Sequence, residues 1–478
     1  MLVRQIVDSQ LAQFAYLVGC PRSGEAIVID PERDVDRYFE EAARHDLRIV
    51  AAVDTHIHAD YLSGLREMAE RGVLVYASKE GGTDWQYEWL IGSEYRHRLL
   101  GHGEAFSVGF IEFHAVHTPG HTPEHLSYLV RDAGAGTEDF IAIASGDFVF
   151  VGDVGRPDLL ERAAGLSGVM VPSARLQFAS IQREFKPLPE FLQVWPAHGA
   201  GSACGKSLGD VPTSTVGYEL RHNRSIRAAA DEQCFVDFIL AGQPEPPAYF
   251  ARMKRENRIG PKLLGDLPAP RRIEAATIAS LAGRRDVAVL DTRPRHAFFA
   301  GHLQGAIHAD LDNEFTAIAG SYVDEDTPVY LVVEDARVTE AVRALVRVGL
   351  DRVVGYLTPQ MLDTFAASDG SLAQTKTIDM ATMETMRVAE KGRVLDVRGA
   401  GEFEADHVAG AIHIPHTRIA AKHNELPKGV GLLVHCSTGV RTASAVSMLE
   451  RLGYEAFAVD DRFAAYRQVR PSHEAVRR

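Results

Sequence analysis

Side chains that could bind a metal ion gather early in the chain, in residues 55–61 (THIHADY). Three more candidates follow or close apolar runs, which places each of them at the end of a predicted strand. The full set is His56, His58, Asp60, His121, Asp147 and His198. Because several strand ends can converge on one edge of a sheet, residues far apart in sequence can form a single metal site there.

The residue after this cluster limits the number of metal ions. The segment resembles the His-x-His-x-Asp-His signature of the metallo-β-lactamase superfamily, in which the last histidine helps to hold a second metal. Tyr61 stands at that position here. A phenol is a much poorer neutral ligand than an imidazole, so we expect one metal ion per chain.

A candidate nucleophile lies near the C-terminal end, in residues 435–441 (HCSTGVR). The predicted strand 432–434 precedes this segment and an amphipathic helix follows it. Cys436 would then lie at a helix N-terminus, where several backbone N–H groups favour the nucleophilic thiolate. Arg441 adds a fixed positive charge beside the loop. A buried, inert cysteine is the alternative.

The second half of the chain contains an internal repeat. Residues 290–309 align without a gap to residues 395–414, and ten of the twenty positions are identical. Each copy is a domain-sized α/β unit rather than a solenoid repeat. We place the two units at residues 271–370 and 375–478.

The middle copy lacks the cysteine. Its strand 330–333 leads directly into Glu334, which we expect at the position of Cys436, in a loop two residues shorter. A carboxylate cannot carry sulfur and would repel an anionic substrate. This copy is therefore predicted to be inactive and retained for packing and assembly, with a binding role as the alternative.

Composition restricts the remaining possibilities. A chain of 478 residues predicts about three domains, of which the first would cover residues 1–245. A linker at 246–270 would follow, with a short helical segment at about 248–257 between two Pro-rich breaks. A net charge of −14 without a basic block disfavours nucleic acid and anionic membranes. No segment resembles a membrane helix or a signal peptide, and the four cysteines form no CxxC pair, so we expect a cytoplasmic protein with reduced thiols.

The Cys436 loop resembles the active loop of rhodanese sulfurtransferases, Cys-x4-Arg. Asp396 and Arg398 match the same family. The resemblance implies that Cys436 takes up a sulfane sulfur, carries it as a persulfide and releases it to an acceptor such as sulfite, assisted by Arg441. The remaining loop residues are Ser437, Thr438, Gly439 and Val440.

The first domain resembles the persulfide dioxygenases of the metallo-β-lactamase superfamily, in residues 14–31, 55–61, 118–122 and 145–158. The resemblance implies one Fe(II) per chain, held by His56, His121 and Asp147. Two imidazoles and a carboxylate leave room on iron for both a persulfide and O₂. The surrounding shell would consist of His58, Asp60, Tyr61, His198, Arg156 and Asp158. The last two could instead be a purely structural ion pair.

Together these resemblances imply an α/β multidomain protein: an N-terminal metallo-β-lactamase αββα sandwich followed by an inactive and an active rhodanese-like domain. The expected reaction oxidises a low-molecular-weight thiol persulfide with O₂ to sulfite and thiol. Transfer of sulfur through Cys436 to that sulfite would give thiosulfate and remove toxic persulfides. The family also suggests a homo-oligomer, either a dimer or a tetramer.

Two questions stay open from the sequence. A binuclear zinc thioester hydrolase of the glyoxalase II kind, with the rhodanese part as a binding module, would share the same histidines and aspartates, although Tyr61 and the fused rhodanese copies argue against it. Cys204 lies shortly after His198, in residues 199–206. It could stand near the iron and exchange with a bound persulfide, or it could be a small packing residue.

Overall fold

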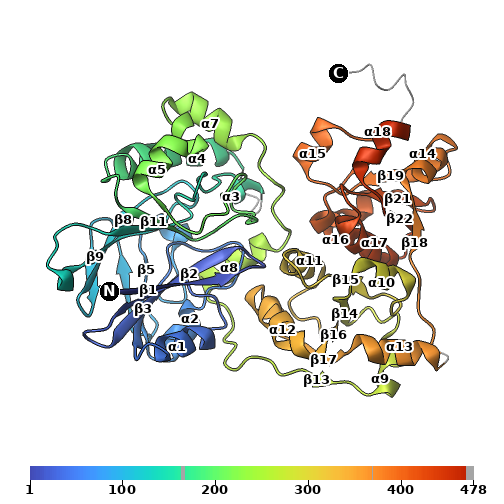
Figure 1. The fold of residues 1–478 in the computed structure, drawn as a ribbon, viewed down its shortest axis with the longest axis horizontal. Coiled ribbons are helices and arrows are strands. Elements are labelled where there is room, and N and C mark those ends of the chain that lie inside the picture. Colours follow the sequence, from blue (N-terminus) through green and yellow to red (C-terminus); the bar gives the residue numbers. More distant parts are fainter. Residues whose placement is uncertain (163–166, 369, 470–478) are drawn as a thin grey trace. The chain divides into compact units, whose positions relative to one another are not determined.

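The computed structural model describes residues 1–162, 167–368 and 370–469 (Figure 1). The predicted domains also include residues 163–166, 369 and 470–478, which lie outside the described residues. The chain packs into two compact units. The first consists of residues 1–266 with 346–348, and the second of residues 267–345 and 349–478.

Two six-stranded sheets form the centre of the first unit, in the orders β1-β2-β3-β4-β5-β6 and β12-β11-β10-β9-β8-β7. The strands of the first sheet are β1 (Leu2–Asp8), β2 (Gln13–Cys20), β3 (Glu25–Ile29), β4 (Arg48–Val53), β5 (Leu74–Ser78) and β6 (His97–Leu100). Those of the second are β7 (Ala105–Val108), β8 (Ile111–His117), β9 (Leu126–Asp132), β10 (Ala142–Gly146), β11 (Gln193–Pro196) and β12 (Ser214–Thr215).

Apolar side chains from both sheets interlock in one buried core, which holds Val18 and Val53 of the first sheet and Phe113 and Val130 of the second. Helices cover the outer faces, as in Figure 1. They are α1 (Asp36–Ala43), α2 (Leu65–Glu70), α3 (Leu159–Arg162), α4 (Met170–Ser180), α5 (Val216–His222), α6 (Arg224–Ala228), α7 (Glu232–Leu240) and α8 (Phe250–Ile259). Two further apolar clusters lie under these helices, so the unit is the predicted αββα sandwich.

The second unit contains two five-stranded parallel sheets with the same strand order, β13-β17-β16-β14-β15 and β18-β22-β21-β19-β20. The strands are β13 (Arg271–Arg272), β14 (Ala288–Asp291), β15 (Ile307–His308), β16 (Val329–Val332), β17 (Val353–Leu357), β18 (Lys376–Ile378), β19 (Arg393–Asp396), β20 (Ile412–His413), β21 (Leu432–His435) and β22 (Ala456–Val459). The shared order confirms the repeat.

Helices flank both of these sheets. In the middle copy they are α9 (Ala275–Leu281), α10 (Arg295–Ala300), α11 (Phe315–Tyr322), α12 (Val338–Arg347) and α13 (Pro359–Ala367). In the last copy they are α14 (Met380–Val388), α15 (Ala400–Ala405), α16 (Ile419–Lys422), α17 (Val440–Leu452) and α18 (Tyr466–Val469). None of the helices described is long and apolar enough to cross a membrane.

Strand pairing corrects the predicted alignment of the two loops. Val332 pairs with Asp291 as His435 pairs with Asp396, so the strands are offset by 103 residues and Val333, not Glu334, occupies the place of Cys436. The glycines that end the following helices, Gly349 and Gly453, are offset by 104. The middle loop is therefore one residue shorter, not two. The sequence alignment had shifted the middle strand by one residue relative to strand β21, which made the loop seem one residue shorter than it is.

The two rhodanese copies pack on each other through helix α17. Ser447 Oγ accepts a hydrogen bond of 2.9 Å from the backbone N–H of His308. The Arg451 guanidinium donates to the carbonyl oxygens of Gly305 and Val287, at 2.7 and 2.8 Å. These contacts bury polar groups of the last copy against the middle copy, and they agree with a packing role for the copy that lacks the cysteine.

Candidate metal centre and sulfur-transfer loop

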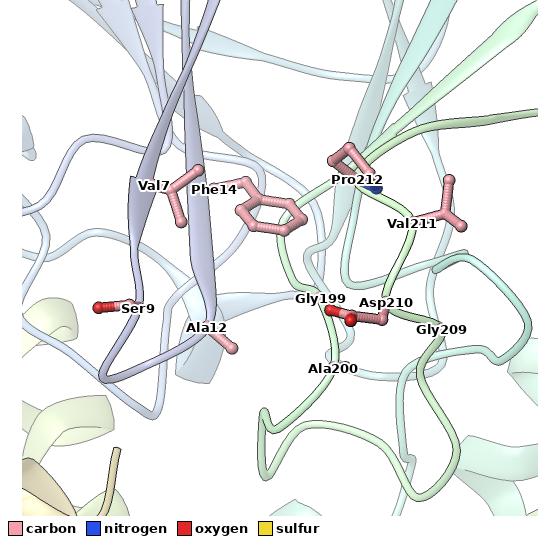
Figure 2. A pocket seen from close by; sticks show the side chains of 10 residues that line it. All are labelled: Val7, Ser9, Ala12, Phe14, Gly199, Ala200, Gly209, Asp210, Val211 and Pro212. Carbon is pink, nitrogen blue, oxygen red and sulfur yellow. The ribbon is translucent and has the colours of Figure 1, made fainter. Parts of the chain in front are cut away.

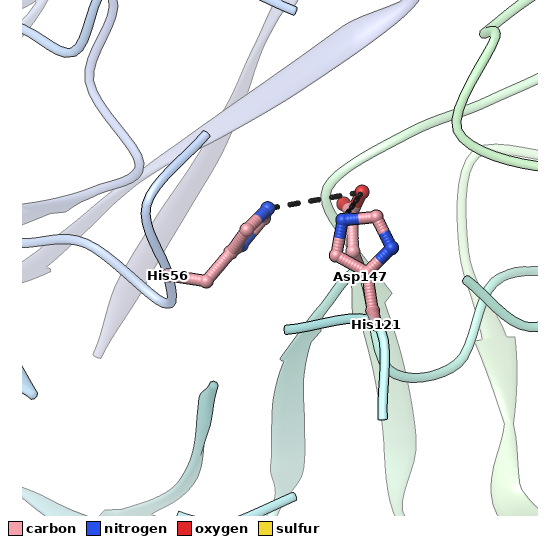
Figure 3. Close-up of side chains that lie close together, drawn as sticks. All are labelled: His56, His121 and Asp147. Atoms are coloured by element: carbon pink, nitrogen blue, oxygen red, sulfur yellow. Dashed lines mark ion pairs between the residues drawn. The ribbon is translucent and has the colours of Figure 1, made fainter. Parts of the chain in front are cut away.

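The three predicted iron ligands lie together, at the ends of three strands. His56 follows β4, His121 follows β8 and Asp147 follows β10 (Figure 3). One ligand atom from each residue lies within 4.8 Å of the others. Asp147 Oδ2 is 3.3 Å from His121 Nε2 and 3.9 Å from His56 Nε2, and all three side chains are buried.

Hydrogen bonds fix which ring nitrogen of each histidine is free. The Thr55 hydroxyl donates to Asp30 at 3.0 Å and lies 3.0 Å from His56 Nδ1, so His56 Nδ1–H donates to it. His121 Nδ1–H donates to the carbonyl oxygen of Arg156 at 3.0 Å. In both rings Nε2 therefore carries a lone pair and no proton, which is the form that binds metal ions. The pKa values of both histidines are well below the usual value, mainly because the two side chains are buried.

Asp147 completes the set of metal-binding donor atoms. Both of its carboxylate oxygens are buried, and neither has a hydrogen-bond partner among the described residues. Asp147 Oδ2 lies near two unprotonated Nε2 atoms, so lone pairs of three donors meet at the centre of the group. Burial raises the pKa of Asp147 to about 6. Such an arrangement is costly without a bound cation, and two imidazoles with one carboxylate fit Fe(II).

A second donor group adjoins the first. Ligand atoms of Asp60, His198 and Cys204 also lie within 4.8 Å of one another, and all three residues are buried. His198 Nε2 is 3.3 Å from Asp60 Oδ2 and 3.5 Å from Asp147 Oδ1. Burial raises the pKa of the Cys204 thiol well above its usual value. The structure thus places Cys204 beside the predicted iron ligands.

His58 and Tyr61 contact each other through their polar atoms. The Tyr61 hydroxyl is 3.0 Å from His58 Nε2, and Asp30 Oδ1 is 3.2 Å from the same nitrogen. Burial alone would lower the pKa of His58, but the Asp30 carboxylate raises it to about 9. Tyr61 also accepts a hydrogen bond of 3.3 Å from Gln13. Asp30, which the sequence analysis did not propose as a site residue, directly follows strand β3 and has a positive φ.

Arg156 and Asp158 form a fully buried ion pair with two hydrogen bonds of 2.7 Å. The same guanidinium donates to the Ala203 carbonyl oxygen at 3.2 Å, and the Arg156 backbone N–H donates to that of Cys204 at 3.1 Å. Since the Arg156 carbonyl oxygen accepts from His121, this pair connects the His121 ligand to the loop that carries Cys204.

Helix α8 is the short helical segment expected at residues 248–257, but the sequence analysis assigned it to a linker and gave its residues no part in the site. In the structure, α8 belongs to the first unit. The Asn257 side chain donates to the carbonyl oxygens of His58 and Tyr61, at 2.9 and 2.7 Å, and accepts from the Ser63 N–H at 2.9 Å. This helix therefore holds the metal-binding loop in place.

A surface pocket of about 250 Å³ lies beside the His198 loop (Figure 2). Ala12, one of its lining residues, accepts a hydrogen bond of 3.2 Å from His198 Nδ1 through its carbonyl oxygen. None of the candidate metal ligands lines it. The lining residues are Val7, Ser9, Ala12, Phe14, Gly199, Ala200, Gly209, Asp210, Val211 and Pro212.

In the last domain, Cys436 lies between strand β21 and helix α17, as predicted, and it is fully buried. The sequence predicted several backbone N–H groups around the sulfur. Among the described residues one donates to it, the Gly439 N–H at 3.1 Å. Gly439 has a φ of +88°, and a side chain there would lie 2.6 Å from the Asp460 carboxylate. Thr438 and Val440 are exposed.

Arg441 is held by Glu402, a residue that the sequence analysis missed. The guanidinium donates to both Glu402 oxygens, at 2.6 and 2.9 Å, and to the Ser437 hydroxyl at 2.9 Å. Burial opposes the charge of Glu402, but Arg441 and Ser437 lower its pKa to about 2. Glu402 lies far from Arg441 in the sequence, and nothing in the sequence pattern of residues 400–405 indicates that the two side chains pair.

Asp396 and Arg398 form a buried ion pair beneath the loop, with contacts of 2.6 to 3.1 Å. This pair positions the backbone before the loop. The middle copy also reaches this site: Arg295 contacts Asp460 at 2.9 Å, and its Nε lies 3.4 Å from where a Cβ on Gly439 would stand.

Comparison with known proteins supports this architecture. The model of the metallo-beta-lactamase superfamily matches residues 9–198, and that of the rhodanese-like domain matches residues 274–359 and 381–468. A solved structure of a metallo-beta-lactamase from Staphylococcus aureus subsp. aureus COL is 36% identical, with a TM-score of 0.66, and the match covers 75% of this chain and 99% of that one.

Curated relatives of two kinds match the first unit. The mitochondrial persulfide dioxygenase ETHE1 of Bos taurus is 26% identical over 201 residues, which are 41% of this chain and 68% of the relative. A hydroxyacylglutathione hydrolase of Glaesserella parasuis is 27% identical over 176 residues, 36% of this chain and 61% of that relative. The chain belongs to the metallo-β-lactamase superfamily and carries tandem rhodanese-like domains behind its metallo-β-lactamase domain, in a fusion related to the persulfide dioxygenases.

Proposed function

We propose that the chain oxidises a low-molecular-weight thiol persulfide with O₂ at one Fe(II), and transfers sulfane sulfur to sulfite through Cys436. The observation that carries the first activity is the His56–His121–Asp147 group, in which unprotonated imidazole nitrogens face an unpartnered carboxylate. The relatives named as persulfide dioxygenases support the same assignment.

The number of metal ions is argued from Tyr61. At its position a histidine would serve a second ion, whereas the Tyr61 hydroxyl lies against His58 Nε2 at 3.0 Å. His56, His121 and Asp147 would hold the iron, which supplies open coordination positions and the redox capacity to activate O₂. Zinc offers no redox change, so the same residues with zinc would not oxidise sulfur.

The residues around the ligands keep this site ordered and dry. The metal-binding histidines and Asp147 are at most about 1% exposed, so water has little access to the reacting sulfur. In the overall reaction one persulfide, one O₂ and one water give the thiol, sulfite and two protons.

Cys204 lies near enough to the ligands to exchange sulfur with a bound persulfide, which extends the proposal to this thiol.

At the second site, the Cys436 thiolate attacks the outer sulfur of a second persulfide. A new S–S bond forms on Cys436, the S–S bond of the donor breaks, and the donor leaves as a thiolate. Sulfite then attacks the outer sulfur of the cysteine persulfide, which yields thiosulfate and regenerates the thiolate. The Gly439 N–H stabilises negative charge on the Cys436 sulfur throughout. Together the two activities would remove sulfide-derived persulfides.

Anaerobic purification with metal analysis tests the first activity, followed by O₂ uptake on a panel of thiol persulfides. We expect one iron per chain and sulfite release in the wild type. His121→Ala should lose the iron and all O₂ uptake, because it removes one of three protein ligands. His222→Ala, a change at an exposed histidine of the same unit, is the matched control and should keep both.

The competing function is a thioester hydrolase with two zinc ions, suggested by the hydroxyacylglutathione hydrolase relatives and by the second donor group Asp60–His198–Cys204. Two tightly bound zinc ions per chain, together with thioester hydrolysis and no O₂ uptake, would establish that function and refute the dioxygenase proposal.

A further inference from the structure

Lys254 is a buried lysine that no part of the proposed chemistry has used so far. It lies on helix α8, three residues before Asn257, so both side chains project from one face of the helix. Asn257 hydrogen-bonds the loop that carries His58 and Tyr61. Lys254 is 8% exposed and therefore points into the first unit, toward the same region.

The charge of Lys254 acts directly on the metal centre. Its ammonium interacts electrostatically with Glu124, Cys204 and Asp147. After burial itself, Lys254 is the strongest influence that lowers the pKa of His121, and it also lowers that of His56. The geometry agrees with this, since Lys254 shares a helix face with Asn257, whose side chain holds the loop that carries His58 and Tyr61.

The protein does not neutralise this charge by contact. Among the described residues, no carboxylate lies within 4.0 Å of the Lys254 ammonium and no acceptor makes a hydrogen bond with it. The nearest contact is the ring of Trp85, whose centroid is 4.7 Å from Nζ. Burial lowers the pKa of Lys254 to about 8, so the group is mostly protonated at neutral pH. The ammonium therefore keeps hydrogen-bond donors that the acceptors of a ligand can use.

We propose that Lys254 binds the anionic sulfur group of the ligand at the metal centre, which is the persulfide anion of the substrate and the oxygens of sulfite as product. A protein with a net charge of −14 needs local positive charge to collect such anions. Lys254 provides it on a helix fixed to the metal loop by Asn257. The inference rests on the proposed persulfide chemistry for the identity of the ligand, but the anion site itself can be measured without turnover.

The test is calorimetric titration of sulfite into the iron-loaded protein under anaerobic conditions, combined with metal analysis and steady-state O₂ uptake. Lys254→Met keeps the length of the side chain and removes its charge. We expect normal iron content, sulfite binding weakened about tenfold or more, and a KM for persulfide raised by a similar factor with a smaller effect on kcat. Lys254→Arg should recover much of the binding. Arg255→Met, the same loss of charge at the next, exposed position, should change none of these values.

Three results would overturn the proposal: sulfite binding by Lys254→Met at the wild-type affinity, failure of the wild type to bind sulfite, or loss of iron from both Lys254 variants, which would place the lysine among the supports of the ligands. If the wild type binds sulfite through Lys254 but consumes no O₂ with any persulfide, the anion site stands and the proposed oxidation fails. The two conclusions are thereby separable.

Discussion

The Arg156–Asp158 ion pair could serve only the stability of the fold, or it could also hold the metal ligands in place, and substitutions can distinguish these two roles. Both side chains are fully buried, so Arg156→Met leaves Asp158 as a carboxylate without its main partner. Loss of one member of a buried pair costs about 3–5 kcal/mol. Arg162 contacts the same carboxylate at 3.1 Å and is 38% exposed, so we expect the lower end, about 3 kcal/mol. For a unit of this size that is a fall of about 6–12 °C in the melting temperature of the first unit.

A double change separates the two roles. Arg156→Met with Asp158→Asn removes both charges and should recover more than half of the lost stability. Iron affinity should nevertheless stay about 10- to 100-fold below wild type, because the guanidinium also binds the Ala203 carbonyl oxygen and so fixes the Arg156 backbone that accepts from His121. The assays are calorimetric melting and iron competition with a chelator, with Arg162→Met as a mild control. Recovery of iron affinity in the double variant would show a purely structural pair, and an unchanged melting temperature in Arg156→Met would refute the burial argument.

Four further predictions concern the second unit. Cys436→Ser should keep O₂ uptake and sulfite release but lose thiosulfate formation, since serine forms no persulfide; equal loss of both activities in a folded protein would contradict separate sites. Gly439→Ala should lower sulfur transfer about tenfold or more, because a φ of +88° and the 2.6 Å approach to Asp460 disfavour any side chain; full activity would show that the loop adapts. Val333→Cys in the Cys436→Ser background should stay inactive, because the middle loop is one residue shorter; recovered transfer would show an intact cradle. The lowered pKa of Glu402, about 2 against 4.5, stabilises the fold above pH 4.5, and this contribution disappears as the pH falls toward 2. Acid unfolding of Glu402→Gln should therefore depend less on pH across that window, and an unchanged profile would exclude this linkage.

The sequence predicted the parts of the site that depend on strand ends and on motif spacing. The six candidate metal-binding residues were recognised because they lie at the ends of predicted strands. The resemblance to the persulfide dioxygenases then implied His56, His121 and Asp147 as the ligands, and the structure brings their ligand atoms together. Cys436 and Arg441 were predicted in the same way. Glu402 and Asp30 were not, because a lone carboxylate carries no spacing signal and its partner is chosen by tertiary packing.

Two other differences have physical causes. The helical segment that forms α8 was expected, but it was assigned to a linker because it lies between two proline-rich breaks, which usually mark one. Its buried residues Phe250, Met253, Lys254 and Asn257 show a helical period, but two of them are polar. The position of Glu334 was wrong because sequence identity ends before strand β16, and only the pairing of Val332 with Asp291 fixes the register.

The three hydrogen bonds of Asn257 determine where the first unit can be cut. A fragment that stops at residue 245, or at residue 198 where the family match ends, retains every proposed iron ligand. It would nevertheless expose the carbonyl oxygens of His58 and Tyr61 and the N–H of Ser63, and the loop that starts at His56 would lose its support. Fragments intended for metal binding should therefore extend to at least residue 266, and an inactive shorter fragment would say nothing about the ligands.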